Sequence, residues 1–253
     1  MQQSKFISKQ PYLFTALIVL AMTVIYIASG AAVTILKLPT FDLYIIANVS
    51  LAILGIVLLT RLQLWKEVGF RAFAVPSELR LYWLPLLPAL VNLSFGVAQI
   101  SILQIAVFFV VAGLIGFVEE VFFRGLILRA IAPLGLWRAA IISSVIFGVA
   151  HSLNILSGSN PISTLLQIGY ALAIGFAFAA VTLRTGVIWP LVIIHALIDF
   201  AGFIAAGKTD ASTTVSTSSI MMSVIYTVTF TAYGVFMMQS GQVKPLSRTK
   251  AAL

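Results

Sequence analysis

The stretch 103-LQIAVFFVVAGLIGFVEEVFFRGLIL-128 decides the fold class of this chain. It is almost entirely apolar, and its only charged residues are Glu119, Glu120 and Arg124. A helix that crosses a lipid bilayer needs about 20 predominantly apolar residues, so this stretch is long enough to span one. The two glutamates and the arginine therefore lie where a charged group is costly, and their presence has to be explained.

The composition of the whole chain agrees with a membrane location. Of its 253 residues, 61% are hydrophobic and only 9% are charged, and the mean hydropathy is +1.11. Soluble domains carry about 25% charged residues. The absence of cysteine excludes disulfides, thiol catalysis and cysteine-ligated zinc. We expect an all-α, polytopic membrane helix bundle that forms one integral-membrane domain over residues 1–253.

Apolar runs separated by charged residues or by Pro, Gly and Ser predict about eight transmembrane helices. The expected spans are 12–36, 43–60, 81–101, 103–128, 137–156, 162–183, 187–206 and 216–239. The boundary between the third and the fourth is the least marked, because 99-QISILQ-104 carries no charge. The first apolar run is longer than the core of a signal peptide, about 7–15 residues, which favours an uncleaved anchor.

The basic residues are distributed unevenly among the connecting segments. With eight spans, thirteen of the 15 Lys and Arg residues fall on the side of both termini, and only Lys37 and Lys208 fall on the other. Cytoplasmic loops are enriched in Lys and Arg, so we expect both termini in the cytoplasm. This pattern accounts for the net charge of +8 without a nucleic-acid partner. The expected location is the cell (plasma) membrane, with multiple passes.

Two segments lie outside the expected spans. The stretch 61-RLQLWKEVGFRAFAVPSELR-80 mixes aromatic with basic side chains, which is typical of a helix at the membrane surface and equally of a basic loop. The tail 240-SGQVKPLSRTKAAL-253 is expected to be a solvated end.

Of the seven acidic residues and two histidines, five fall inside the expected spans: Glu119, Glu120, His151, His195 and Asp199. Such groups are costly at membrane depth and usually mark a functional interior. At a rise of about 1.5 Å per residue, they lie roughly 13–22 Å from the nearest basic residue that flanks their own span. Three spans thus bring them to a common depth, where they can meet. The alternative is a set of polar contacts that merely hold helices together.

Local spacing indicates pairs among these residues. Glu120 and Arg124 are four apart in the favourable acid-first order, so we expect an ion pair between them. His195 and Asp199 share a helix face in the same way, as do Phe147 and His151. Glu119 is left as the carboxylate without a partner on its own helix.

Several proteolytic mechanisms are excluded by inspection. No His-Glu pair is present for an HExxH zinc site, and Asp199 is the only aspartate inside a span, so an aspartic dyad has no second member. Ser157 and Ser159 lie in an expected outer turn, too shallow to be an intramembrane nucleophile. Two alternatives remain open. One is a water activated by a general base with imidazole stabilising an oxyanion; the other is a divalent metal, such as zinc, held by Glu119, His151, His195 and Asp199.

Three short motifs resemble those of a known family. The sequences 119-EEVFFR-124, 147-FGVAH-151 and 195-HALID-199 match EExxxR, FxxxH and HxxxN/D, in that order and on successive helices. Together they resemble the CPBP family of intramembrane endopeptidases, also called Abi, which includes CAAX proteases and bacteriocin-processing proteins. The resemblance covers a motif core of about 119–199. It implies cleavage of a membrane-associated peptide or protein at a site open to the cytoplasm.

The resemblance also implies roles for individual residues. Glu119 corresponds to the glutamate that activates the water, and His151 to the histidine that helps to hold it. His195 and Asp199 correspond to the pair that stabilises or orients the oxyanion. Glu120 and Arg124 occupy supporting positions. CAAX-processing members usually have Asn where this chain has Asp199, and an ionised Asp only accepts hydrogen bonds.

The sequence leaves other functions open. Many bacterial members of the family that this chain resembles are linked to peptide maturation or bacteriocin self-immunity, so a non-catalytic immunity protein that has kept the fold is an alternative. A proton- or ion-coupled transporter would use intramembrane His and acidic residues as a relay. Transporters usually contain paired halves, and the sequence shows none.

Overall fold

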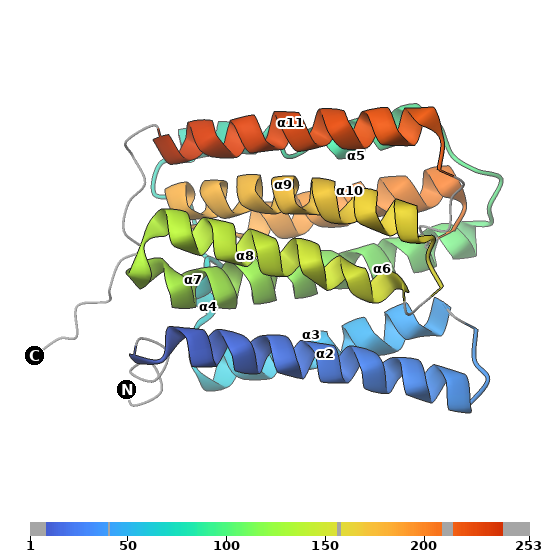
Figure 1. Ribbon diagram of the computed structural model, residues 1–253, viewed down its shortest axis with the longest axis horizontal. Coiled ribbons are helices and arrows are strands. Elements are labelled where there is room, and N and C mark those ends of the chain that lie inside the picture. The colour runs from blue at the N-terminus through green and yellow to red at the C-terminus, as the bar shows by residue number, and fades with distance from the viewer. Residues whose placement is uncertain (1–8, 40, 156–157, 209–214, 240–253) are drawn as a thin grey trace, which may run out of the picture.

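The computed structural model describes residues 9–39, 41–155, 158–208 and 215–239, and the expected solvated tail 240–253 lies outside these. The described residues are all-helical, as predicted, and the long helices lie side by side along the longest axis of the molecule (Figure 1). Seven helical stretches are long and apolar enough to cross a membrane. They are α2 (Pro11–Ile35), α3 (Phe41–Arg61), α6 with its continuation (Ile102–Leu134), α8 with its continuation (Leu136–Ile155), α9 (Pro161–Thr185), α10 (Trp189–Ala206) and α11 (Thr217–Gln239).

The third expected span, 81–101, does not form one continuous helix. It is divided among a 3₁₀-helix η1 (Pro76–Tyr82), a turn, the short helix α5 (Leu87–Ser94) and an irregular segment that leads to α6. Pro85 and Pro88 lack the backbone N–H that an uninterrupted helix needs, and Gly96 has a φ of +83°. Figure 1 shows that this broken segment still passes from one end of the bundle to the other.

Long-range contacts place α9 and α10 among the other helices. α9 packs against α8 on one side and α11 on the other, while α10 packs against α6 and α5. The second half of α9 is buried and rich in Ala and Gly, which lets neighbouring helices approach closely. α2 and α3 pair with each other, and α3 also contacts α6.

The segment 61–80 was expected to be either a helix at the membrane surface or a basic loop, and it combines features of both. Only α4 (Trp65–Val68) and the start of η1 are helical, and the remainder is irregular. The segment is docked on the turn between α9 and α10, where Arg71 Nε donates to the backbone oxygen of Gly186 at 3.1 Å. Arg129 NH2 donates to the same oxygen at 3.2 Å. These contacts lie at the end of the bundle that carries most of the described basic residues, referred to below as the basic end.

The basic end also holds the start of α2 and the end of α11 (Figure 1). The turn between α2 and α3 and the turn between α8 and α9 lie at the opposite end, referred to below as the far end. Of the described Lys and Arg residues, only Lys37 and Lys208 belong to the far end. This arrangement agrees with the spacing of charges in the sequence.

Candidate active site

The first motif lies where α6 passes into a π-helical segment. α6 (Ile102–Glu119) ends at Glu119, and η2 (Glu120–Ile127) continues with π-helical hydrogen bonding. Such segments are rare and frequently occur at functional sites. Every residue of η2 is buried, so it forms a packed floor between the site and the basic end. An apolar pattern predicts a span here but not its change of helical type.

Gly116 allows α6 to approach α10 closely. A Cβ at this position would lie 2.7 Å from the backbone oxygen of Val192 and 2.8 Å from the backbone nitrogen of Ala196. Small residues permit such approaches between membrane helices. Because Gly116 lies one helical turn before Glu119 and Glu120, the approach places both carboxylates beside His195.

Glu120 is the centre of a buried network. Its Oε1 accepts a hydrogen bond from Arg124 NH1 at 2.9 Å, the pair predicted from spacing, and it lies 2.8 Å from His195 Nδ1. The side chains of Glu120 and Arg124 are 0% and 1% exposed. Since a carboxylate accepts, Nδ1 of His195 carries the proton in this hydrogen bond. Nε2 is then the nitrogen that His195 presents to the other acidic residues.

Aromatic rings enclose the Arg124 guanidinium. Its Cζ lies 4.2 Å from the ring centroid of Phe147 and 5.3 Å from that of Phe178. Both rings also lie edge-on to His195, each at a centroid distance of 6.1 Å. Cation–π contacts and the Glu120 pair thus hold Arg124 in an apolar interior. Phe147 supports the network from α8.

Glu119 and Asp199 converge on the other side of His195. Nε2 of His195 lies 3.3 Å from Glu119 Oε2 and 3.9 Å from Asp199 Oδ2. These carboxylates are 24% and 23% exposed, whereas Glu120 is fully buried. The two adjacent glutamates therefore have different environments: Glu120 belongs to the packed interior and Glu119 faces open space.

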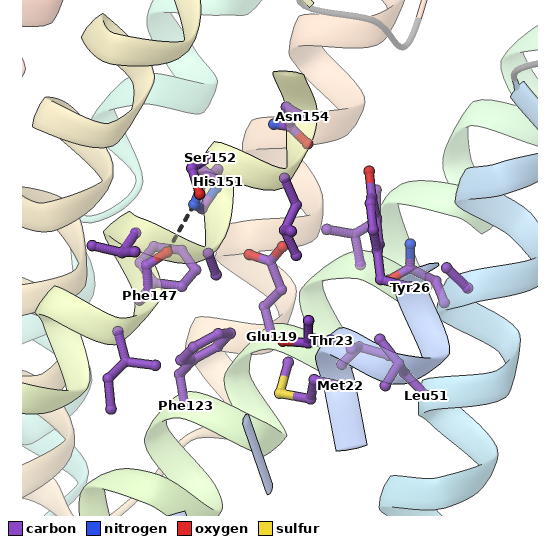
Figure 2. A pocket seen from close by; sticks show the side chains of 18 of the residues that line it. Met22, Thr23, Tyr26, Leu51, Glu119, Phe123, Phe147, His151, Ser152 and Asn154 are labelled. Carbon is purple, nitrogen blue, oxygen red and sulfur yellow. Dashed lines mark hydrogen bonds between the residues drawn. The ribbon is translucent and has the colours of Figure 1, made fainter. Parts of the chain in front are cut away.

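His151 ends α8 and begins the 3₁₀ turn η4 (His151–Ile155). Its Nδ1 donates to the backbone oxygen of Phe147 at 2.9 Å, because a carbonyl can only accept. The imidazole packs edge-on against the Phe147 ring, with centroids 4.9 Å apart. Figure 2 shows this hydrogen bond and the Glu119 side chain on the neighbouring wall of the pocket.

A cavity of about 520 Å³ joins these residues. Glu119, His151, His195 and Asp199 all line it, so the structure brings together the four residues predicted for catalysis. The opposite wall comes from α2 and α3 (Figure 2). Three amide side chains also line the cavity, namely Asn48, Asn154 and Gln167.

Glu119, His151, His195 and Asp199 are also the residues that the sequence predicts as candidate ligands for a divalent metal. Zinc sites in proteins take at least three protein ligands. Among the described residues, no group of three or more His, Cys, Asp or Glu side chains is arranged to hold a metal ion. Glu119, His151, His195 and Asp199 thus do not form a metal-ligand set in this arrangement.

Sequence spacing missed two features of the site. The hydrogen bond between His195 and Glu120 joins residues that are 75 apart, and no local pattern indicates it. The amide side chains that line the cavity are not predicted either, because the cost of placing charge at membrane depth singles out ionisable groups alone. Amides within apolar runs are a signal that would have identified them.

Comparison with known proteins gives information about the protein family only. Residues 99–201 match the family described as type II CAAX prenyl endopeptidase Rce1-like. A search of curated proteins and a search of solved structures found no match to the chain. The matched segment contains all three motifs and extends from the start of α6 through most of α10. Over these residues, the match confirms the resemblance to CAAX-type endopeptidases that the three motifs carry.

Proposed function

We propose that this protein is an intramembrane endopeptidase that hydrolyses a peptide bond of a membrane-associated peptide or protein. Glu119 acts as the general base that activates the attacking water. The observation that carries the proposal is the position of Glu119: it shares a cavity with His151 and Asp199 and lies 3.3 Å from His195 Nε2. The family match supports the same chemistry at a coarser level.

The side chains suit a hydrolysis in two steps. Glu119 takes a proton from a water held with the help of His151, and the water oxygen attacks the carbonyl carbon of the scissile bond. The oxyanion that forms accepts a hydrogen bond from His195 when Nε2 carries a proton. The C–N bond then breaks, and the proton on Glu119 passes to the leaving amine.

Glu120 and Arg124 act through His195. Glu120 Oε1, fixed by Arg124, holds the Nδ1–H of His195 and so determines which nitrogen faces the cavity. Asp199 lies on the cavity side of the same imidazole at 3.9 Å and helps to orient it. Glu120, Arg124 and Asp199 therefore have positioning roles.

Mass spectrometry of membrane peptides tests the proposal. Peptides from cells that express the wild type are compared with those from cells that express Glu119→Gln, which keeps the size of the side chain but cannot accept the proton. At least one pair of fragments is expected in the cells with the wild type and is expected to be absent from the cells with Glu119→Gln. Identical peptide sets at equal protein levels would contradict it and would favour a non-catalytic immunity protein.

A further inference from the structure

Two guanidinium groups at the basic end share one carbonyl oxygen. The backbone oxygen of Gly186, in the turn between α9 and α10, accepts from Arg71 Nε at 3.1 Å and from Arg129 NH2 at 3.2 Å. Arg71 belongs to the segment 61–80 and Arg129 to α7 (Leu128–Ile131), so residues far apart in the sequence meet here. Both groups are positively charged and repel each other. Their close approach therefore favours a negative charge beside them.

The described residues do not supply that charge at contact distance. Among them, no carboxylate forms an ion pair with Arg71 or Arg129. Glu67 of α4 acts on Arg129 only from a greater distance, and its side chain is exposed. Arg129 Nε is buried and has no acceptor within the described part of the chain. Since a guanidinium has more N–H donors than one bond uses, both groups can donate to a further anion.

The backbone holds Arg71 in this position. Gly186 has a φ of +70°, and a Cβ there would collide with the Arg71 guanidinium, so glycine lets this group lie directly against the turn. Trp189 Nε1 donates to the backbone oxygen of Arg71 at 3.2 Å, and the amide of Ile188 donates to the oxygen of Gly69 at 3.1 Å. Arg71 is thus fixed through its main chain as well as its side chain.

All four tryptophans of the chain lie at the basic end. Trp65 begins α4, Trp83 follows η1, Trp137 lies in the first turn of α8 and Trp189 begins α10. Figure 1 shows α4 and α7 together at this end. Tryptophan is enriched at the level of the lipid headgroups, because its ring is apolar and its N–H is polar. Arg71, bonded to Trp189, therefore lies at the depth of the lipid phosphates.

We propose that Arg71 and Arg129 bind the phosphate of an anionic phospholipid at the basic end. The fork of N–H donors on a guanidinium matches the oxygens of a phosphate. The excess of Lys and Arg predicts that this end faces the cytoplasm, and the cytoplasmic leaflet carries anionic lipids. The lipid holds the segment 61–80 against the turn between α9 and α10. This binding is independent of the proposed hydrolysis.

Thermal unfolding in detergent tests the proposal. The full-length protein is titrated with phosphatidylglycerol, with phosphatidylcholine of the same acyl chains and with inorganic phosphate. Phosphatidylglycerol is expected to raise the melting temperature in a saturable way, because a ligand that binds only the folded state stabilises it. An equal rise with phosphatidylcholine would overturn the requirement for an anionic headgroup. An equal rise with inorganic phosphate would show a site for a free anion and would overturn the proposal of a lipid.

A pair of variants locates the binding site. Arg71→Gln is expected to raise the apparent dissociation constant for phosphatidylglycerol about 10-fold or more, the effect of losing a hydrogen bond to a charged group. Arg138→Gln is the matched control, because it removes the same charge from an exposed position at the same end. It should leave the dissociation constant nearly unchanged. Equal weakening in both variants would overturn the proposal, since the lipid would then respond to overall charge.

The loss of the Arg71–Gly186 hydrogen bond can itself lower stability, so each shift is measured from the variant's own melting temperature in phosphatidylcholine. Arg71→Lys keeps the charge but replaces the donor fork by a point charge. It should weaken phosphatidylglycerol binding by less than Arg71→Gln does. If Arg71→Gln does not fold, Arg71→Lys is compared with Arg138→Lys, and equal lipid affinities of these two variants would contradict the site.

Discussion

At the scale of single residues, the site depends on two neighbouring glutamates that the fold treats differently. Glu120 is fully buried and joins Arg124 to His195, and Glu119 is exposed to the cavity. The different environments of the two glutamates follow from their position at the junction of α6 and η2. Substitution of each should therefore produce a different kind of defect.

Glu120→Gln is expected to destabilise the protein. The change leaves the Arg124 guanidinium buried without a carboxylate, and breaking such a pair costs about 3–5 kcal/mol. The measurement is thermal unfolding of the purified protein in detergent. Glu67→Gln, at an exposed position of α4, is the matched control and should change stability by less than about 0.5 kcal/mol. Equal melting temperatures for both variants would contradict the network.

Asp199→Asn is expected to keep at least about a tenth of the wild-type cleavage rate. The amide preserves the size of the side chain and can donate a hydrogen bond to an oxyanion, as the Asn of related enzymes is expected to do. Asp199→Ala removes the contact with His195 Nε2 and should lose more activity. The rates of both variants are compared on one peptide. An Asn variant as inactive as the Ala variant would show that a carboxylate is required there.

At the scale of secondary structure elements, close approach of α6 and α10 assembles the site. Gly116→Ala would place a methyl group against the backbone of Val192 and Ala196, and overpacking of this kind costs about 1–3 kcal/mol. We expect lower thermal stability together with a loss of cleavage. Gly113→Ala on the same helix is the control, since a Cβ there meets no atom within 4 Å. Equal behaviour of the two variants would exclude the close approach.

The 3₁₀-helix η1, which continues the docked segment to Tyr82, is a second element with a measurable contribution. Tyr82 OH donates to the backbone oxygen of Val187 at 2.9 Å and shares a hydrogen bond of 2.7 Å with Thr185 Oγ1. Burial raises the pKa of the Tyr82 phenol, so the group remains a donor. Tyr82→Phe should cost about 1–3 kcal/mol in thermal unfolding. Tyr12→Phe, at a position that is 57% exposed, should have no measurable effect.

At the scale of the whole molecule, the matched segment 99–201 supplies the four predicted site residues, and α2 and α3 complete the cavity from outside it. Met22→Trp is expected to fill part of the cavity and to reduce cleavage while thermal stability is retained. Val24→Trp, two residues away and 54% exposed on α2, is the control. Equal cleavage by both variants would show that this wall does not contact the substrate.

Much of this molecule follows from its sequence, because apolar length and charge distribution are strong signals in a membrane. Seven of the expected spans appear as helices within a few residues of their predicted bounds. The span 81–101 differs because two prolines and Gly96 interrupt a run that hydropathy alone treats as continuous. The common depth of Glu119, His151, His195 and Asp199 within their spans predicted that these residues can meet. Depth alone cannot show which carboxylate contacts which nitrogen, so the Glu120–His195 bond emerged only from the structure.

The most direct test of the account is the rate of peptide cleavage by purified protein in liposomes, measured by mass spectrometry for the wild type, Glu119→Gln and Glu67→Gln. Glu119→Gln is expected to lower the rate about 10²–10⁴-fold, the usual contribution of a general base, and to unfold at the wild-type temperature. Glu67→Gln should cleave at the wild-type rate. Full activity of a correctly folded Glu119→Gln variant would contradict the role of Glu119 and with it the proposed mechanism.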